Sequence, residues 1–223
     1  MINLFFGANK AGRSHILLSV AKALSNMYKV LVVDMTASQG VFNYLEIDKF
    51  EENFDIYTRE FDIAKNFRKA NLNSEKYDYI LVEADKDIDK VLLKKSKKIF
   101  LVQNYDKDIF NKNLEILYEN NKFIDEDKFN IIFNQLLPES KLNIDVMYGD
   151  LISRLENKFK ATKNDYILIP YSIEDLIFSC NNKFRGKFNF SEYSNAFKDG
   201  LYEIVNKIDP QIDEKRFKGL SLK

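Results

Sequence analysis

The sequence predicts an α/β fold, with a doubly wound, mostly parallel sheet and helices on both of its faces. Short, nearly continuous apolar runs recur along the chain, as they do in strands that are covered on both sides. Segments with the apolar spacing of amphipathic helices separate these runs. Strands that alternate with helices imply right-handed crossovers and a parallel sheet.

Six runs rich in β-branched or aromatic residues are predicted to be strands. They cover residues 2–6, 29–34, 77–84, 98–103, 128–134 and 165–170. A weaker candidate strand covers residues 54–57. Between them, helical spacing occurs at residues 14–27, 109–120, 143–159 and 192–208.

The chain is predicted to form a single domain over residues 1–208, because no internal repeat, low-complexity linker or composition break divides it. After Pro210 the sequence has no clear periodicity. Residues 209–223 are therefore expected to form a mobile or loosely packed tail.

Composition narrows the functional classes. The 223 residues include 34 Lys and Arg against 34 Asp and Glu, and this zero net charge argues against nucleic-acid binding. The single cysteine, Cys180, excludes an internal disulfide or a cysteine zinc site, and it is expected in the core. No apolar run approaches the roughly 18 residues of a membrane span, and no signal peptide pattern opens the chain. We expect a cytoplasmic protein.

The segment "GANKAGRS", residues 7–14, follows the first strand and opens the first helix. Gly7, Gly12 and Ser14 have the spacing of the phosphate-binding loop G-x-x-x-x-G-K-[ST]. Glycines let backbone N–H groups approach phosphate oxygens, and the helix N-terminus adds positive potential. The candidate nucleotide-binding residues here are Gly7, Ala8, Asn9, Lys10, Ala11, Gly12, Arg13, Ser14 and His15.

The loop departs from the motif at Arg13, where the motif has lysine. A guanidinium group is planar and bulkier than an ammonium group, so the exchange is not conservative at a tight site. Two interpretations stay open: Arg13 pairs with phosphate, or it fills the pocket. Lys10 is a candidate source of the missing ammonium group.

Five segments, in order, resemble the MinD/ParA family of deviant-Walker P-loop ATPases. They are the loop itself, "KVLVVDMTASQGVFNYLE" (29–46), "YDYILVEAD" (77–85), "IIFN" (131–134) and "ILIPYS" (167–172). The resemblance covers roughly residues 1–180. Residues 29–45 are most similar to the branch that includes the TadZ/CpaE pilus-localisation proteins.

The resemblance implies a site for ATP or ADP with Mg²⁺. Asp34 would be the catalytic residue, binding Mg²⁺ through water or orienting the attacking water. Ser14, Asp34 and Glu83 would hold the metal. The nucleotide base would lie against Asn134, Pro170 and Tyr171.

Several family positions are altered. The signature lysine near the start of the family's loop falls at Ala8, and a second acidic position falls at Thr36. Phosphoryl transfer depends on positioning and charge stabilisation, and one lost donor costs about 3–4 kcal/mol. We therefore expect weak or absent ATP hydrolysis, with nucleotide bound loosely or not at all.

Three functions follow as hypotheses. The first is a ParA/MinD-like or TadZ/CpaE-like positioning or scaffold protein, acting as a homodimer with a protein partner in a secretion, pilus or partition apparatus. The second is an active Mg²⁺-dependent ATPase of partition or localisation, and the third a small-molecule P-loop kinase or synthetase. Basic and apolar residues alternate in "EKRFKGLSLK" (214–223), faintly like the membrane-targeting end of MinD, so only weak or indirect membrane contact is expected.

Overall fold

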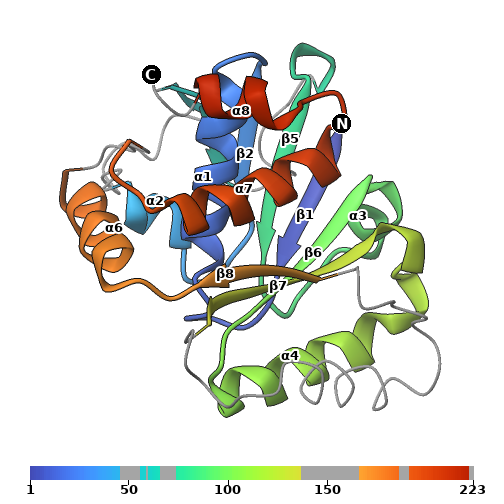
Figure 1. Ribbon diagram of the computed structural model, residues 1–223. Coiled ribbons are helices and arrows are strands. Elements are labelled where there is room, and N and C mark those ends of the chain that lie inside the picture. The colour runs from blue at the N-terminus through green and yellow to red at the C-terminus, as the bar shows by residue number, and fades with distance from the viewer. Residues whose placement is uncertain (46–55, 59, 66–73, 137–165, 186–190, 221–223) are drawn as a thin grey trace.

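The computed structural model describes residues 1–45, 56–58, 60–65, 74–136, 166–185 and 191–220 (Figure 1). Within these residues an eight-stranded sheet has the order β3-β4-β2-β5-β1-β6-β7-β8. All neighbouring strands are parallel except β3 and β4. The strands are β1 (Ile2–Phe6), β2 (Val30–Asp34), β3 (Ile56–Thr58), β4 (Asp62–Lys65), β5 (Tyr79–Ala84), β6 (Lys98–Gln103), β7 (Phe129–Leu136) and β8 (Tyr166–Pro170).

Helices cover both faces of the sheet, as the sequence predicts. Figure 1 shows α1, α7 and α8 on one side and α3 and α4 on the other. The described helices are α1 (Arg13–Ser25), α2 (Gly40–Tyr44), α3 (Lys90–Lys95), α4 (Lys107–Asn120), α6 (Ile173–Arg185), α7 (Asn195–Ile208) and α8 (Glu214–Leu220).

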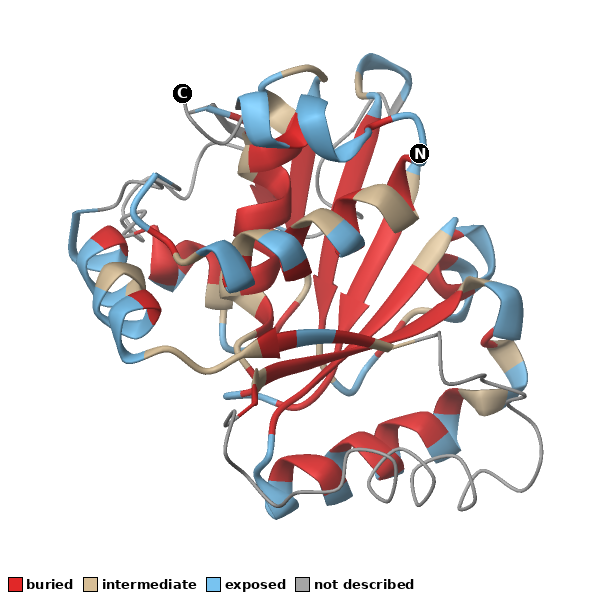
Figure 2. Cartoon of the chain, in the orientation of Figure 1, coloured by how far each residue is buried: buried red, intermediate tan, exposed pale blue. Residues whose placement is uncertain are grey.

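Strands β2 and β5 are buried along their whole length, and β1 is buried from its second residue onward (Figure 2). Successive side chains of a strand point to opposite faces. Phe5 and Val32 accordingly join the apolar cluster under α1 and α7, while Phe6 and Val33 join the cluster under α3 and α4. This two-sided burial explains why the strands appear in the sequence as continuous apolar runs.

The six predicted strands all form, and the weaker candidate corresponds in part to β3. Three of the four predicted helices form as α1, α4 and α7, whereas the prediction for residues 143–159 lies outside the described residues. The sequence analysis did not predict β4, α2 and α3, which are only four, five and six residues long, and it also missed α6, which has 13 residues.

The C-terminal segment differs from the loosely packed tail expected for residues 209–223. Ile212 and Phe217 are almost fully buried in the cluster under α1 and α7, and Phe217 lies against the ring of Tyr202. The carboxylate of Asp209 accepts hydrogen bonds from the hydroxyls of Tyr28 and Tyr79, both at 2.8 Å. Ile212 and Phe217 are five positions apart and do not form the apolar pattern of an amphipathic helix in the sequence. Their burial is nevertheless enough to hold α8 against the core.

Helix α6 is amphipathic, but its buried positions are polar and apolar residues lie on its exposed face. Its buried positions are Asp175 and Asn182, whereas its exposed apolar residues include Ile177 and Phe184, which is 79% exposed. Cys180, expected in the core, is exposed on the same helix. None of the described helices has the length and apolar character needed to cross a membrane.

Candidate functional site

The segment between β1 and α1 forms a tight loop that requires its glycines. Gly7, Lys10 and Gly12 have φ angles of 141°, 72° and 85°. A Cβ atom on Gly7 would lie 2.8 Å from the carbonyl oxygen of Val102, and one on Gly12 would overlap the Asn134 side chain. Only glycine satisfies both the backbone geometry and the packing at these two positions.

Three asparagine side chains hold this loop from the neighbouring strands and α4. Asn113 Oδ1 accepts a hydrogen bond from the backbone N–H of Ala8 at 2.6 Å. Asn134 Nδ2 donates to the carbonyl of Ala11 at 2.9 Å, and Asn104 Nδ2 donates to that of Lys10 at 3.3 Å. The loop is therefore supported from outside, as a preorganised binding loop must be.

The sequence analysis missed Asn104 and Asn113. Asn113 is fully buried in α4, between the apolar positions that face the sheet. A lone amide among the core positions of a helix is the signal that could have found it, because a buried polar group needs a partner.

The Arg13 side chain is buried against the loop and is paired within the protein. Its Nε lies 2.9 Å from Glu83 Oε1, and its Nη1 donates to the carbonyl oxygen of Gly7. Ser14 Oγ also donates to Glu83 Oε1, at 2.7 Å. The guanidinium charge is therefore neutralised inside the protein.

Glu83 is fully buried, and its Oε2 has no hydrogen-bond partner in the described structure. Burial raises the pKa of Glu83, an effect that the Arg13 charge opposes and the Asp34 charge reinforces. The ionised form of this carboxylate thus depends on Arg13.

Asp34 lies beside Glu83, because the two residues are in register on β2 and β5. Its carboxylate points toward the start of α2. Oδ1 accepts from the backbone N–H and the hydroxyl of Thr36, at 2.9 and 2.7 Å, and Oδ2 accepts from the N–H of Val41 at 2.9 Å. The carboxylate that meets the loop is that of Glu83.

The loop opens onto a cleft of about 540 Å³, within the usual size range of small-ligand sites. Most loop residues, including Lys10 and Ser14, line it together with Glu83, Asn134 and residues around α2. The far wall comes from α6, through Ser179 and Lys183, which the sequence analysis did not single out.

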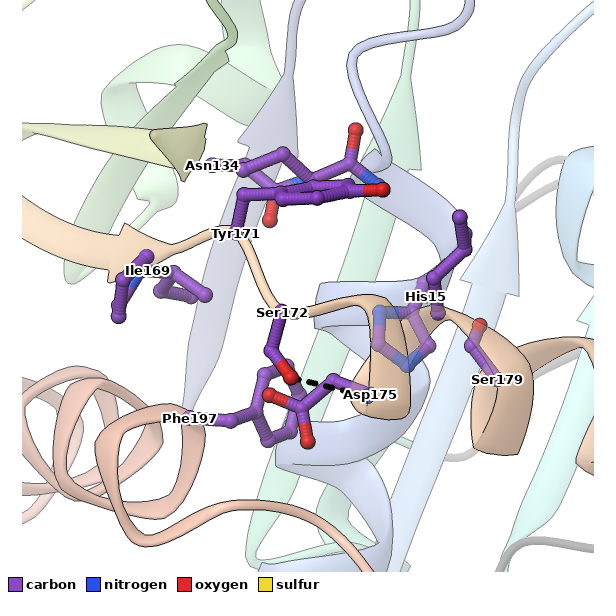
Figure 3. Close-up of a pocket in the computed structure, with 11 residues that line it drawn as sticks. His15, Asn134, Ile169, Tyr171, Ser172, Asp175, Ser179 and Phe197 are labelled. Carbon is purple, nitrogen blue, oxygen red and sulfur yellow. Dashed lines mark hydrogen bonds between the residues drawn. The ribbon is translucent and has the colours of Figure 1, made fainter. Parts of the chain in front are cut away.

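The residues expected around the base lie together at a second, smaller pocket of about 30 Å³ (Figure 3). Asn134, Pro170, Tyr171 and His15 are among its lining residues. This volume holds about one water-sized group. Asn134 and His15 line both cavities, so the two adjoin.

His15 packs among aromatic rings. Tyr44, Tyr193 and Phe197 surround its imidazole at centroid distances of 5.3 to 6.0 Å, and Nε2 lies 3.0 Å from the Tyr193 hydroxyl. Burial lowers the pKa of His15 to about 4. The ring is therefore neutral at pH 7 and helps to fix α1 against α2 and α7.

Magnesium fits one part of this site. Mg²⁺ keeps several waters and takes one or two carboxylates together with substrate phosphates. Ser14 Oγ and the unpartnered Oε2 of Glu83 offer such hard oxygens, whereas the Asp34 oxygens are engaged. No cluster of three or more His, Cys, Asp or Glu residues suited to a metal occurs within the described ranges.

The fold combines a glycine loop between the first strand and the first helix of a parallel sheet with an acidic residue on an adjacent strand. The fold is that of the P-loop ATPases of the ParA/MinD kind. No protein-family model matches the sequence, and no curated protein matches it.

Solved structures share the fold. A chain of the MinC:MinD cell division complex of Aquifex aeolicus has a TM-score of 0.65 at 15% identity, over 92% of this chain and 96% of that one. A structure described as a plasmid partition protein of Borrelia burgdorferi with bound AMPPNP has a TM-score of 0.61 at 16% identity, over 93% and 98%. The pNOB8 ParA protein bound to nonspecific DNA has a TM-score of 0.58 at 14% identity, over 94% and 98%.

Proposed function

We propose that this protein is a nucleotide-binding positioning or scaffold protein of the ParA/MinD kind with weak or no ATP hydrolysis. The observation that carries the proposal is the state of the loop. Its glycine geometry and its supporting asparagines are intact, but the residue at the lysine position is bound internally to Glu83 and Gly7. Such a loop retains backbone donors for phosphate but has no free charge at the motif's lysine position, where Arg13 is paired with Glu83.

Each group of the site has a separate role in the proposed nucleotide binding. The loop N–H groups, apart from that of Ala8, which donates to Asn113, would bind phosphate together with the N-terminus of α1. Ser14 and Glu83 would hold Mg²⁺, which supplies charge neutralisation to the phosphates when bound. Asn134 and Tyr171 would lie toward the base, once the small pocket widens. Asp34 Oδ2 accepts one hydrogen bond, from the N–H of Val41, so its second lone pair could orient water.

An active ATPase is the second candidate, favoured by the Ser14–Glu83 hydrogen bond and by Asp34 on the next strand. The test is steady-state phosphate release by the purified protein with Mg²⁺-ATP, beside titration calorimetry with ATP and ADP. We expect nucleotide binding with turnover at the background rate. Turnover that disappears in Asp34→Ala would refute the scaffold proposal and establish the ATPase.

We further propose a homodimer that works with a protein partner in a partition, secretion or pilus apparatus, as in the TadZ/CpaE branch. Two of the solved relatives are described as a partition protein and as a complex with a partner protein. The exposed apolar residues of α6 support the dimer, because large apolar side chains on one surface helix mark interaction sites. These residues flank the cleft wall, so nucleotide occupancy would influence the contact.

A further inference from the structure

Lys183 stands on α6, 170 positions after the loop arginine, and no phosphate-binding motif includes it. It nevertheless lines the cleft of about 540 Å³ across from the loop. Its ammonium group forms no ion pair or hydrogen bond within the described part of the chain, and the same holds for Lys10.

The charge of the cleft comes from these two lysines. Arg13 and Glu83 neutralise each other, and the low pKa of His15 keeps its ring uncharged. Among the described residues that line the cavity, Lys10 and Lys183 are therefore the positive groups without a paired carboxylate. A cavity of this size with a glycine loop at one wall and two ammonium groups suits a polyanion such as a nucleoside triphosphate.

Contacts on its inner face fix α6 in this position. Asp175 accepts hydrogen bonds from the backbone N–H and the hydroxyl of Ser194, both at 2.6 Å. The Tyr44 hydroxyl lies 3.2 Å from the carbonyl of Ser179, which joins α6 to α2. Ser179 and Lys183 are one helical turn apart, so both project to the cleft side of the fixed helix.

We propose that Lys183 binds the outer phosphates of the nucleotide and supplies, from α6, positive charge that the loop lacks at Ala8 and Arg13. The inference rests on the proposed nucleotide binding and deepens it. A lysine suits this role because its compact charge on a flexible stem can follow the ligand, whereas the Arg13 fork is committed to Glu83.

The test is titration calorimetry of the full chain with ATP and with AMP, comparing wild type, Lys183→Gln and Arg185→Gln. Arg185 is an exposed residue of the same helix that does not line the cleft, so its variant matches the change in charge. We expect Lys183→Gln to weaken ATP binding about tenfold, as for loss of one charge-assisted contact. AMP affinity and the Arg185→Gln variant should stay near wild type, and added salt should reduce the ATP difference.

The outcomes separate the two proposals. If the wild-type protein binds ATP and Lys183→Gln binds it equally well, the role of Lys183 is refuted while nucleotide binding stands. An equal loss for AMP, or an equal loss in Arg185→Gln, also refutes it. If the wild-type protein binds no ATP, the proposed function fails and this inference fails with it. Thermal unfolding of each variant checks the fold, which an exposed lysine should not alter.

Discussion

The pair formed by Arg13 and Glu83 determines the chemistry of the loop. The guanidinium cannot lose its proton, whereas a buried carboxyl can gain one. The two partners are therefore not equivalent: removing Glu83 leaves a buried charge, and removing Arg13 leaves an acid that can become neutral. Glu83→Gln is expected to lower the free energy of unfolding by about 3–5 kcal/mol.

The stability of Arg13→Met should depend on pH. Glu83 has a pKa above its ordinary 4.5 in the folded state, and loss of Arg13 raises it further. A raised folded pKa means that the folded state binds more protons, so the free energy of unfolding falls as pH rises above about 4.5. The destabilisation of Arg13→Met relative to wild type should thus grow with pH, as measured by urea unfolding at about pH 5 and about pH 8.

The Arg13→Met/Glu83→Gln double variant is the control, because its residue 83 does not titrate in this range. The free energy of unfolding of the double variant should therefore change less with pH than that of Arg13→Met. A destabilisation by Arg13→Met that is equal at both pH values would mean that Glu83 does not control it.

At the scale of elements, α8 shows how a segment without periodicity becomes part of the core. Phe217→Ala should lower the free energy of unfolding by about 3–5 kcal/mol, because it removes a side chain that is only 2% exposed. Phe184→Ala, on the exposed face of α6, should change it by less than about 0.5 kcal/mol. Urea unfolding without nucleotide measures both, and equal effects would place Phe217 outside the core.

Helix α6 and the short elements could not be predicted from the spacing of apolar residues. Amphipathic spacing predicted α1, α4 and α7, because these helices turn an apolar stripe toward the sheet. In α6 the same type of stripe faces outward, while Asp175 and Asn182 are buried through bonds to the segment before α7. Spacing identifies an apolar face but not what that face contacts.

At the scale of the molecule, the proposed homodimer makes α6 an interface. Phe184→Glu should weaken ATP-dependent dimerisation at least tenfold, because it places a charge in an apolar contact. Val91→Glu is the matched control, since Val91 is an exposed apolar residue on α3, across the sheet. Sedimentation equilibrium with and without ATP measures the effect, and a dimer that survives Phe184→Glu would assign the interface elsewhere.

The sequence by itself determined the fold class, the position of the phosphate-type loop and most of the strands. These features are local: runs of apolar residues report two-sided burial, and glycine spacing reports backbone geometry. Gly12, Ser14, Glu83 and Asn134 do meet around one cleft.

Only the tertiary structure decided which partner each polar group takes. It paired Arg13 with Glu83, turned Asp34 toward α2 and brought Lys183 to the cleft from α6. The physical reason is that Glu83 lies 70 positions and Lys183 170 positions after Arg13, so the distances between these residues depend on strand order and helix placement. No periodicity within one segment carries that information.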